Sequence, residues 1–402
     1  MLPFDILEYQ RRIHLTKIKM EEKGIDVLLI SDPANMNYLT GYDAWSFYVH
    51  QMVAIIIDEP QPIWLGRYQD ASGAKAKTWI YDENVIAYPD YYVHSETHHP
   101  MDFIGEILTQ IGQGRRSIGL EMDHYYFTAK AFDRLKKALP NATFKDGDLL
   151  VNNVRLIKSD QEIDYMKKAA MIADQAMFHG VESIRAGVRE CDTAAKIYYH
   201  MVSGTDEFGG DYPSIVPLLP SGKNTGIPHL TWTDRKFDEG DSVIVELAGC
   251  YKRYHVPLAR TVSIGAPSPN LERLAPIVVE GVNEVLEAAK PGLTCGELEE
   301  VWRKSIGRYG IEKEARLGYS VGLGYPPDWG EHTASIRKGD ATVLQPNMTF
   351  HLIPALWFEN YGIEISETLR ITDQGCETFT KYPRELTVKH PFIIHQHGGE
   401  IS

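Results

Sequence analysis

The sequence predicts a protein of mixed α/β (α+β) class that folds as two domains. Short apolar runs at residues 26–30 and 51–58 are typical of buried strands, and they alternate with longer amphipathic stretches such as residues 5–23. The length of 402 residues is enough for two domains with separate cores. The hydrophobic content of 43% is ordinary for a globular chain.

The first domain is predicted over residues 1–157. A helix over residues 5–23 is expected to end at Gly24, because glycine readily adopts the left-handed conformation that closes a helix. The other predicted elements are strands at 26–30, 51–58, around Trp64 and at 118–120, and helices near 101–112 and 127–139.

The second domain is predicted over residues 158–392, followed by a tail at 393–402. Ser159 is a candidate N-cap, and Glu162 completes a capping box that starts a helix running to about residue 184. The other predicted elements are helices at 190–203, 269–290 and 296–309, two strands flanking a turn at 238–241, and strands near 317–323, 349–353 and 363–371.

Charge and cysteine content restrict the partners and the compartment. The formal net charge of −14 disfavours nucleic acid and anionic membranes, which would repel such a surface. The four cysteines are scattered without a CxxC pair, which is typical of reduced thiols. The N-terminus lacks a signal-peptide pattern, and no apolar run reaches the roughly 18–20 residues of a membrane span. We therefore expect a cytoplasmic protein.

Two residues stand out chemically, and the residues alone leave the role of each open. Glu246 lies within the apolar run Ser-Val-Ile-Val-Glu-Leu-Ala-Gly, where a carboxylate is costly to bury without a partner. A salt-bridged structural residue is the simpler interpretation, and a catalytic carboxylate is the alternative. His229 follows Pro228 in a loop, where it is either a solvent-facing residue or a general acid and base.

Four ordered segments carry a family resemblance. They are RLIKSDQEI, the long stretch from PSGKNTGIPHLTW to YHVPLARTVSIG, LGYSVGLGYPP, and the pair LQPNMTFHLIPALWF and IEISETLRIT. Together they resemble the "pita-bread" fold of methionine aminopeptidases, prolidases and creatinases. The first half resembles the creatinase-type N-terminal domain. The resemblance implies a creatinase-like α/β domain followed by a pita-bread catalytic domain, and a homodimer.

The departures from this family concern its metal site. The peptidases bind two metal ions with two Asp, one His and two Glu. The matching positions here are occupied by Glu246, Pro257, Tyr319, Ile353 and Ser366. Hard divalent ions require carboxylate or imidazole ligands, and Pro257 and Ile353 offer no side-chain ligand atom. We therefore expect no metal and no other cofactor, so that metal-bound hydroxide is not the nucleophile.

Within the family, the chain resembles the ectoine hydrolases. The segments concerned are GYDAWSFYVHQ, GGDYPSIVPLLPSG, PHLTW, ELAGCYKRYHVPLARTV and GYPPDWGE. The resemblance implies hydrolytic opening of ectoine, a cyclic amidine amino acid, to N-acetyl-L-2,4-diaminobutyrate, with hydroxyectoine as a further candidate substrate. It places Glu246 at the first catalytic carboxylate, as nucleophile or base. His229 matches the catalytic His of creatinases.

Further residues are predicted to contact the substrate. In this fold the first domain of one subunit commonly covers the active site of its partner, and aromatic faces attract amidinium cations. Trp45, Phe47 and Tyr48 are candidates for this role, and core packing is the alternative. The polar candidates on the strands of the second domain are His255, Tyr319, His351 and Glu364.

Three other residues near these segments receive structural interpretations. Arg260, which precedes Thr261, is expected to form a structural ion pair. Trp329 and Glu331 come after two prolines and are predicted to lie in a lid loop.

The alternative functions are a metal-dependent Xaa-Pro peptidase, another creatinase-like C–N hydrolase, and a binding module without catalytic activity.

Overall fold

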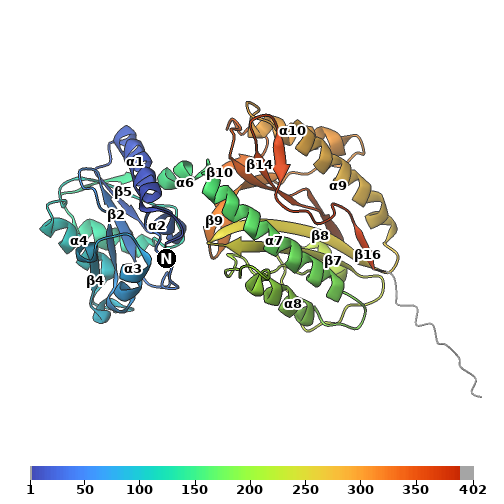
Figure 1. The fold of residues 1–402 in the computed structure, drawn as a ribbon, viewed down its shortest axis with the longest axis horizontal. Helices are drawn as coiled ribbons and strands as arrows, with labels where there is room; N and C mark the ends of the chain where they lie inside the picture. Colours follow the sequence, from blue (N-terminus) through green and yellow to red (C-terminus); the bar gives the residue numbers. More distant parts are fainter. Residues whose placement is uncertain (1, 390–402) are drawn as a thin grey trace, which may run out of the picture. The chain divides into compact units, whose positions relative to one another are not determined.

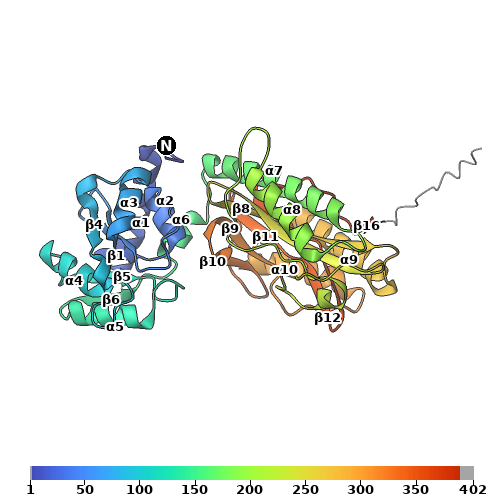
Figure 2. The same cartoon turned by 90° about the horizontal axis from the view of Figure 1, so that it is seen from below.

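The computed structural model describes residues 2–389. The chain divides into two compact units, Met1–Arg155 and Leu156–Ser402 (Figures 1 and 2). The division falls after Arg155, and the predicted domain boundary falls after residue 157. The tail predicted at 393–402 lies outside the described residues.

The first unit is a six-stranded sheet with helices around it (Figure 1). Its strands, in the order β4-β3-β2-β1-β5-β6, are Val85–Tyr88, Ile63–Arg67, Met52–Ile56, Val27–Ile30, Ser117–Leu120 and Thr143–Asp146. Its helices are α1 (Ile6–Lys23), α2 (Pro33–Thr40), α3 (Ala71–Lys77), α4 (Pro100–Gln110), α5 (Ala129–Ala138) and α6 (Leu150–Arg155). Gly24 closes α1 with a φ of 61°, as predicted.

The second unit is built on an eight-stranded sheet. Its strands are β7 (Ser242–Tyr251), β8 (Tyr254–Ile264), β9 (Gly318–Tyr325), β10 (Asp328–Ile336), β11 (Thr349–Leu352), β14 (Glu367–Ile371), β15 (Cys376–Thr378) and β16 (Thr387–Lys389). A separate hairpin joins β12 (Ala355–Phe358) and β13 (Tyr361–Glu364). The helices are α7 (Asp160–Ser183), α8 (Glu190–Ser203), α9 (Pro269–Ala288) and α10 (Cys295–Gly307).

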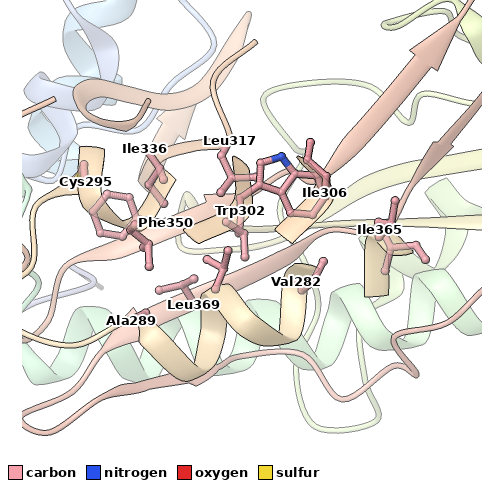
Figure 3. Packing of buried hydrophobic residues seen from close by; sticks show 14 of the residues in the cluster. Val282, Ala289, Cys295, Trp302, Ile306, Leu317, Ile336, Phe350, Ile365 and Leu369 are labelled. Carbon is pink, nitrogen blue, oxygen red and sulfur yellow. The ribbon is translucent and has the colours of Figure 1, made fainter. Parts of the chain in front are cut away.

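Apolar helix faces hold the strands of the second unit in place. The predicted capping box of Ser159 and Glu162 is present at the start of α7. Helices α7 and α8 share a buried apolar cluster with β7 and β8, beside which they lie in Figure 1. A second cluster joins α9 and α10 to β10, β11 and β14, and Figure 3 shows Trp302 among its aliphatic side chains. Two packed faces thus fix the strands that carry the polar site.

Two predictions about strands were wrong in detail. Only β7 flanks the turn at 238–241, because residues 233–237 hydrogen-bond through their backbone to Gly187–Cys191 instead of forming a ladder. The predicted strand over 363–371 is interrupted between β13 and β14. There the N–H of Ser366 donates to the carbonyl of Ala259, so the chain leaves the β12–β13 hairpin for the large sheet.

Arg260 forms the predicted structural ion pair. Its Nη2 lies 2.7 Å from Oε1 of Glu367, and both side chains are buried. The guanidinium also donates to the carbonyls of Ala259, Ser366, Tyr382 and Pro383. A buried cation with this many acceptors ties β8 to the segment beyond β15.

Replacing Arg260 with Met is expected to destabilise the protein by about 3–5 kcal/mol, because it leaves the Glu367 carboxylate buried without its main partner. Urea unfolding followed by tryptophan fluorescence measures the change. The control Lys137→Met breaks an exposed ion pair with Asp133 and is expected to cost less than about 1 kcal/mol. Equal losses in the two variants would contradict the assignment.

Candidate active site

Two carboxylates are buried close to each other in the second unit. Glu246 lies on β7 opposite Ala259 of β8, and only 8% of it is exposed. Glu364 is the last residue of β13 and is 3% exposed. Its backbone N–H donates to the hydroxyl of Thr261, which in turn donates to the Glu364 carbonyl. Thr261 thus anchors Glu364 beside the hairpin that carries Glu246.

Few groups in the described part of the protein offset the cost of burying these two carboxylates. Among the described residues, neither forms an ion pair within 4 Å, and Oε1 of Glu364 is buried without a hydrogen-bond partner. Burial is the main reason that the pKa of Glu246 lies well above its usual range, and repulsion from Glu364 raises this pKa further. Burial raises the pKa of Glu364 to about 7, although Lys313 opposes this shift. The pair therefore retains a proton near neutral pH.

A hydrogen-bonded relay lies next to the carboxylate pair. Trp329 Nε1 donates to the hydroxyl of Tyr319 over 2.7 Å, and that hydroxyl lies 3.2 Å from Nδ1 of His351. Nε2 of His351 lies 2.9 Å from the hydroxyl of Ser366, which also accepts the N–H of Ala259. The relay thus connects β9, β10, β11 and the start of β14.

The members of this relay are electrically neutral. The pKa of His351 is lowered to about 3, mainly by burial and also by the positive charge of Arg316. The pKa of Tyr319 is raised well above its usual range, mainly by burial and also by the negative charge of Glu246. With the His351 proton on Nδ1, the imidazole donates to the Tyr319 oxygen, and the single O–H of the neutral phenol is left to donate to Glu246 or to a bound ligand. Of the predicted residues, the structure therefore groups Glu246, Glu364, Tyr319 and His351.

His255 is fully engaged by its surroundings. Its Nδ1 lies 2.9 Å from the carbonyl of Arg253, and its Nε2 accepts the N–H of Ser214 over 2.9 Å. Burial, followed by the charge of Arg253, lowers its pKa to about 3. The imidazole is neutral, and its ring nitrogens bind the protein itself.

His229 lies in an exposed loop close to the strand of Glu246. Leu218 exchanges two backbone hydrogen bonds with Glu246, and the neighbouring Leu219 donates to Leu230. The segment around Leu218 and Leu219 therefore lies between β7 and the loop that carries His229. The His229 side chain is exposed, its φ is 66°, and no described residue gives it a hydrogen bond. Its imidazole is accessible to an incoming ligand.

The aromatic candidates of the first unit are mostly exposed. Trp45 is 59% exposed and Tyr48 55%, so core packing does not explain either side chain. Phe47 is half-buried, and its ring centroid lies 4.7 Å from that of Trp45. Exposed aromatic rings of this kind are available to bind a partner surface or a ligand.

The lid loop predicted for Trp329 and Glu331 is wrong. Both residues lie on β10 and are 1% exposed. Trp329 belongs to the relay, and Glu331 forms a buried ion pair with Lys158, whose Nζ lies 2.6 Å from Oε2. A pair of prolines indicates a loop, but β9 and β10 pair almost up to this turn, and the strand after the turn is part of the sheet.

Two cations near the site were missed. Lys313 and Arg316 lie in the polar loop between α10 and β9, which gives no periodic signal. Lys313 Nζ donates to the carbonyl of Ile353 over 2.7 Å. Arg316 stacks with its Cζ 4.3 Å from the ring centroid of Tyr319. Only the fold shows that this loop reaches the buried carboxylates.

Comparison with known protein families shows to which family this chain belongs. Residues 164–373 match the sequence profile of metallopeptidase family M24, and residues 12–157 match that of the creatinase/prolidase N-terminal domain. The chain belongs to metallopeptidase family M24. It is a hydrolase with the creatinase-like N-terminal domain and pita-bread catalytic domain expected from its sequence.

Relatives of this M24 protein include enzymes with different activities. An ectoine hydrolase of Halomonas elongata is 45% identical, over 96% of this chain and 99% of its own. An uncharacterized hydrolase/peptidase of Sinorhizobium fredii is 46% identical, over 97% of this chain and 99% of its own. An Xaa-Pro dipeptidase of Pyrococcus horikoshii is 28% identical, over 91% of this chain and 96% of its own.

Solved structures share the fold. The prolidase of Pyrococcus horikoshii matches with a TM-score of 0.78 and 26% identity, over 94% of this chain and 99% of its own. The X-Pro aminopeptidase of Thermotoga maritima matches with a TM-score of 0.79 and 26% identity, over 95% of this chain and 99% of its own. In the described part of this M24 protein, no helix is both long and apolar enough to cross a membrane.

The donors of this M24 site do not fit the family's two metal ions. Pro257 and Ile353 present no side-chain ligand, and the Ser366 hydroxyl is committed to Ala259 and His351. Within residues 2–389, no group of three or more His, Cys, Asp or Glu side chains is arranged to hold a metal ion. Two divalent cations require several carboxylate or imidazole ligands, which this site lacks.

The carboxylate pair is expected to show a protonated carboxyl group near neutral pH. Infrared spectra at pH 6 should contain a buried carboxylic-acid C=O band that Glu246→Gln weakens without abolishing it, because Glu364, with a pKa of about 7, stays largely protonated in that variant. Glu364→Gln should move the loss of this band to lower pH, because it removes the repulsion that raises the Glu246 pKa. The control Glu359→Gln, at an exposed position, should leave the band in place. A wild-type spectrum without such a band at pH 6 would contradict the electrostatics.

Proposed function

We propose that this protein hydrolyses the cyclic amidine ring of ectoine to N-acetyl-L-2,4-diaminobutyrate without a metal ion. The observation that carries the proposal is the buried pair of Glu246 and Glu364, which has no ion-pair partner among the described residues. A protonated amidine supplies the missing positive charge. The 45% identity to the ectoine hydrolase of Halomonas elongata supports this choice of substrate. Hydroxyectoine, with the same ring, is a further candidate.

In the proposed reaction Glu246 forms the first new bond. The amidinium cation lowers the pKa of Glu246 when it binds, so that the proton leaves and the carboxylate is ionised. An oxygen of Glu246 bonds to the ring carbon between the two nitrogens, and one C–N bond of that carbon breaks as the departing nitrogen takes up a proton. Water then attacks the same carbon and gives a proton back to the group that protonated the departing nitrogen, the bond to Glu246 breaks, and the carboxylate is restored.

A general-base role for Glu246 is the alternative, in which it deprotonates the attacking water. The mass of the enzyme during turnover distinguishes the two roles, because only a nucleophilic Glu246 becomes covalently bonded to a substrate molecule. His229 is proposed to protonate the departing nitrogen and then to assist the attack of water, because its exposed imidazole lies in a loop only one chain segment away from the strand of Glu246.

The remaining candidates are proposed to position the substrate. Glu364 faces the amidinium together with Glu246, and Tyr319, held by Trp329 and His351, donates a hydrogen bond. His255 is not proposed to contact the substrate, contrary to the expectation from the sequence, because its ring nitrogens bind the Ser214 N–H and the Arg253 carbonyl. We propose a cytoplasmic homodimer in which Trp45, Phe47 and Tyr48 cover the partner's site. No nucleic acid and no membrane takes part.

A metal-dependent Xaa-Pro dipeptidase is the second candidate, which the 28% identity to the Pyrococcus horikoshii enzyme favours. That function needs metal ligands at positions occupied here by Pro257 and Ile353. It predicts cleavage of Xaa-Pro dipeptides that depends on added metal, whereas the proposed function predicts cleavage of the amidine ring.

Ectoine turnover followed by chromatography tests the proposal. Glu246→Gln is expected to reduce kcat by about 10³-fold or more, because the amide is neither nucleophile nor base. His229→Ala is expected to reduce kcat by about 10²- to 10⁴-fold, the usual contribution of a general acid and base. The control Glu359→Gln should retain wild-type kcat. Rapid turnover by Glu246→Gln, or no ectoine turnover by the wild type, would contradict the proposal.

A further inference from the structure

The active site has a cation that the reaction described above does not use. Lys313 lies in the loop between α10 and β9, and its side chain is half-buried. Its Nζ donates to the carbonyl of Ile353 over 2.7 Å and lies 5.4 Å from the ring centroid of Trp357. Ile353 occupies one of the positions where the M24 peptidases carry a metal ligand. The ammonium therefore lies beside a position at which the family carries a metal ligand.

Lys313 is held close to the carboxylates without neutralising them. Among the described residues it forms no ion pair within 4 Å, and the Ile353 carbonyl uses only one of its three N–H groups. Burial lowers the pKa of Lys313 to about 8, and the charge of Glu364 opposes this shift. Two donors of a partly desolvated ammonium thus remain available near the site. A bound anion satisfies such a group better than water does.

The charges of the site match those of a zwitterion. Glu246 and Glu364 together carry a single net negative charge when they share one proton, and Lys313 carries one positive charge. The substrate of the proposed reaction has one amidinium and one carboxylate on the same small ring. If the amidinium meets the two glutamates, its carboxylate is directed toward a cation at the edge of the site. Lys313 and Arg316 are the cations that this loop supplies.

We propose that Lys313 is the anion-binding residue of this active site, pairing with the substrate carboxylate while Glu246 and Glu364 face the amidinium. This inference rests on the proposed function. Lys313 is preferred over Arg316 because Arg316 is exposed and lies over the ring of Tyr319. Lys313, in contrast, is bonded to Ile353 and interacts electrostatically with Glu364. The site then selects cyclic amidines that carry a carboxylate and discriminates against uncharged analogues.

A comparison of ectoine with its carboxamide tests the proposal. The carboxamide keeps the amidine and removes the negative charge. The wild type is expected to prefer ectoine by about 10- to 100-fold in kcat/KM, the effect of one desolvated charged hydrogen bond. Lys313→Met should raise the KM for ectoine and reduce this preference to within about twofold, whereas Lys313→Arg should retain part of it. The control Lys338→Met removes an exposed lysine and should leave the preference unchanged.

The possible outcomes separate the inference from the proposed function. If the wild type does not hydrolyse ectoine, the proposed function fails, and this inference fails with it. If the wild type hydrolyses ectoine but does not prefer it over the carboxamide, only the inference fails, and this result needs no variant. An unchanged preference in Lys313→Met overturns the inference, as does a preference lost instead in Arg316→Leu. Equal losses of kcat/KM for both substrates in Lys313→Met would mean that the residue acts on Glu364, which also overturns it.

Discussion

The active site depends on two carboxylates that the fold buries without an ion pair within 4 Å among residues 2–389. Glu246 and Glu364 lie on separate β hairpins of the second unit, and repulsion between them adds to the cost of burial. A protein tolerates such a pair when a proton, a metal ion or a ligand compensates the charge. In the M24 metallopeptidases two metal ions have this role. Here a shared proton and a cationic substrate are proposed to take it.

The surrounding structure preserves this arrangement. The Arg260–Glu367 ion pair and the Thr261 hydroxyl join β8 to the strands around Glu364. In the proposed reaction, the relay from Trp329 through Tyr319 and His351 takes the place of metal coordination with fixed hydrogen bonds between neutral groups. Such preorganised dipoles stabilise charge without having to reorganise during a reaction. The proposed function therefore uses the fold of the M24 metallopeptidases for hydrolysis by protein side chains alone.

Local sequence signals predicted most of the regular elements. Gly24 ends α1, and the Ser159–Glu162 capping box starts α7, because both depend on short-range chemistry that is visible in a few residues. The prediction for Trp329 and Glu331 failed because two prolines indicate a loop but not the strand pairing beyond it. Lys313 was missed because nothing in a polar loop reveals which distant strand it approaches. The buried apolar run around Glu246 marked that residue, whereas its interaction with Glu364 depends on long-range pairing.

In the proposed reaction the carboxylate pair performs hydrolysis without a divalent ion. The most direct test is ectoine turnover by protein stripped with a strong chelator, with the metal content of the same sample determined by mass spectrometry. The predicted result is an unchanged kcat at metal contents far below one ion per chain, with no increase on addition of Mn²⁺, Co²⁺ or Zn²⁺. A kcat that disappears with the metal and returns in proportion to the ion bound would contradict the claim.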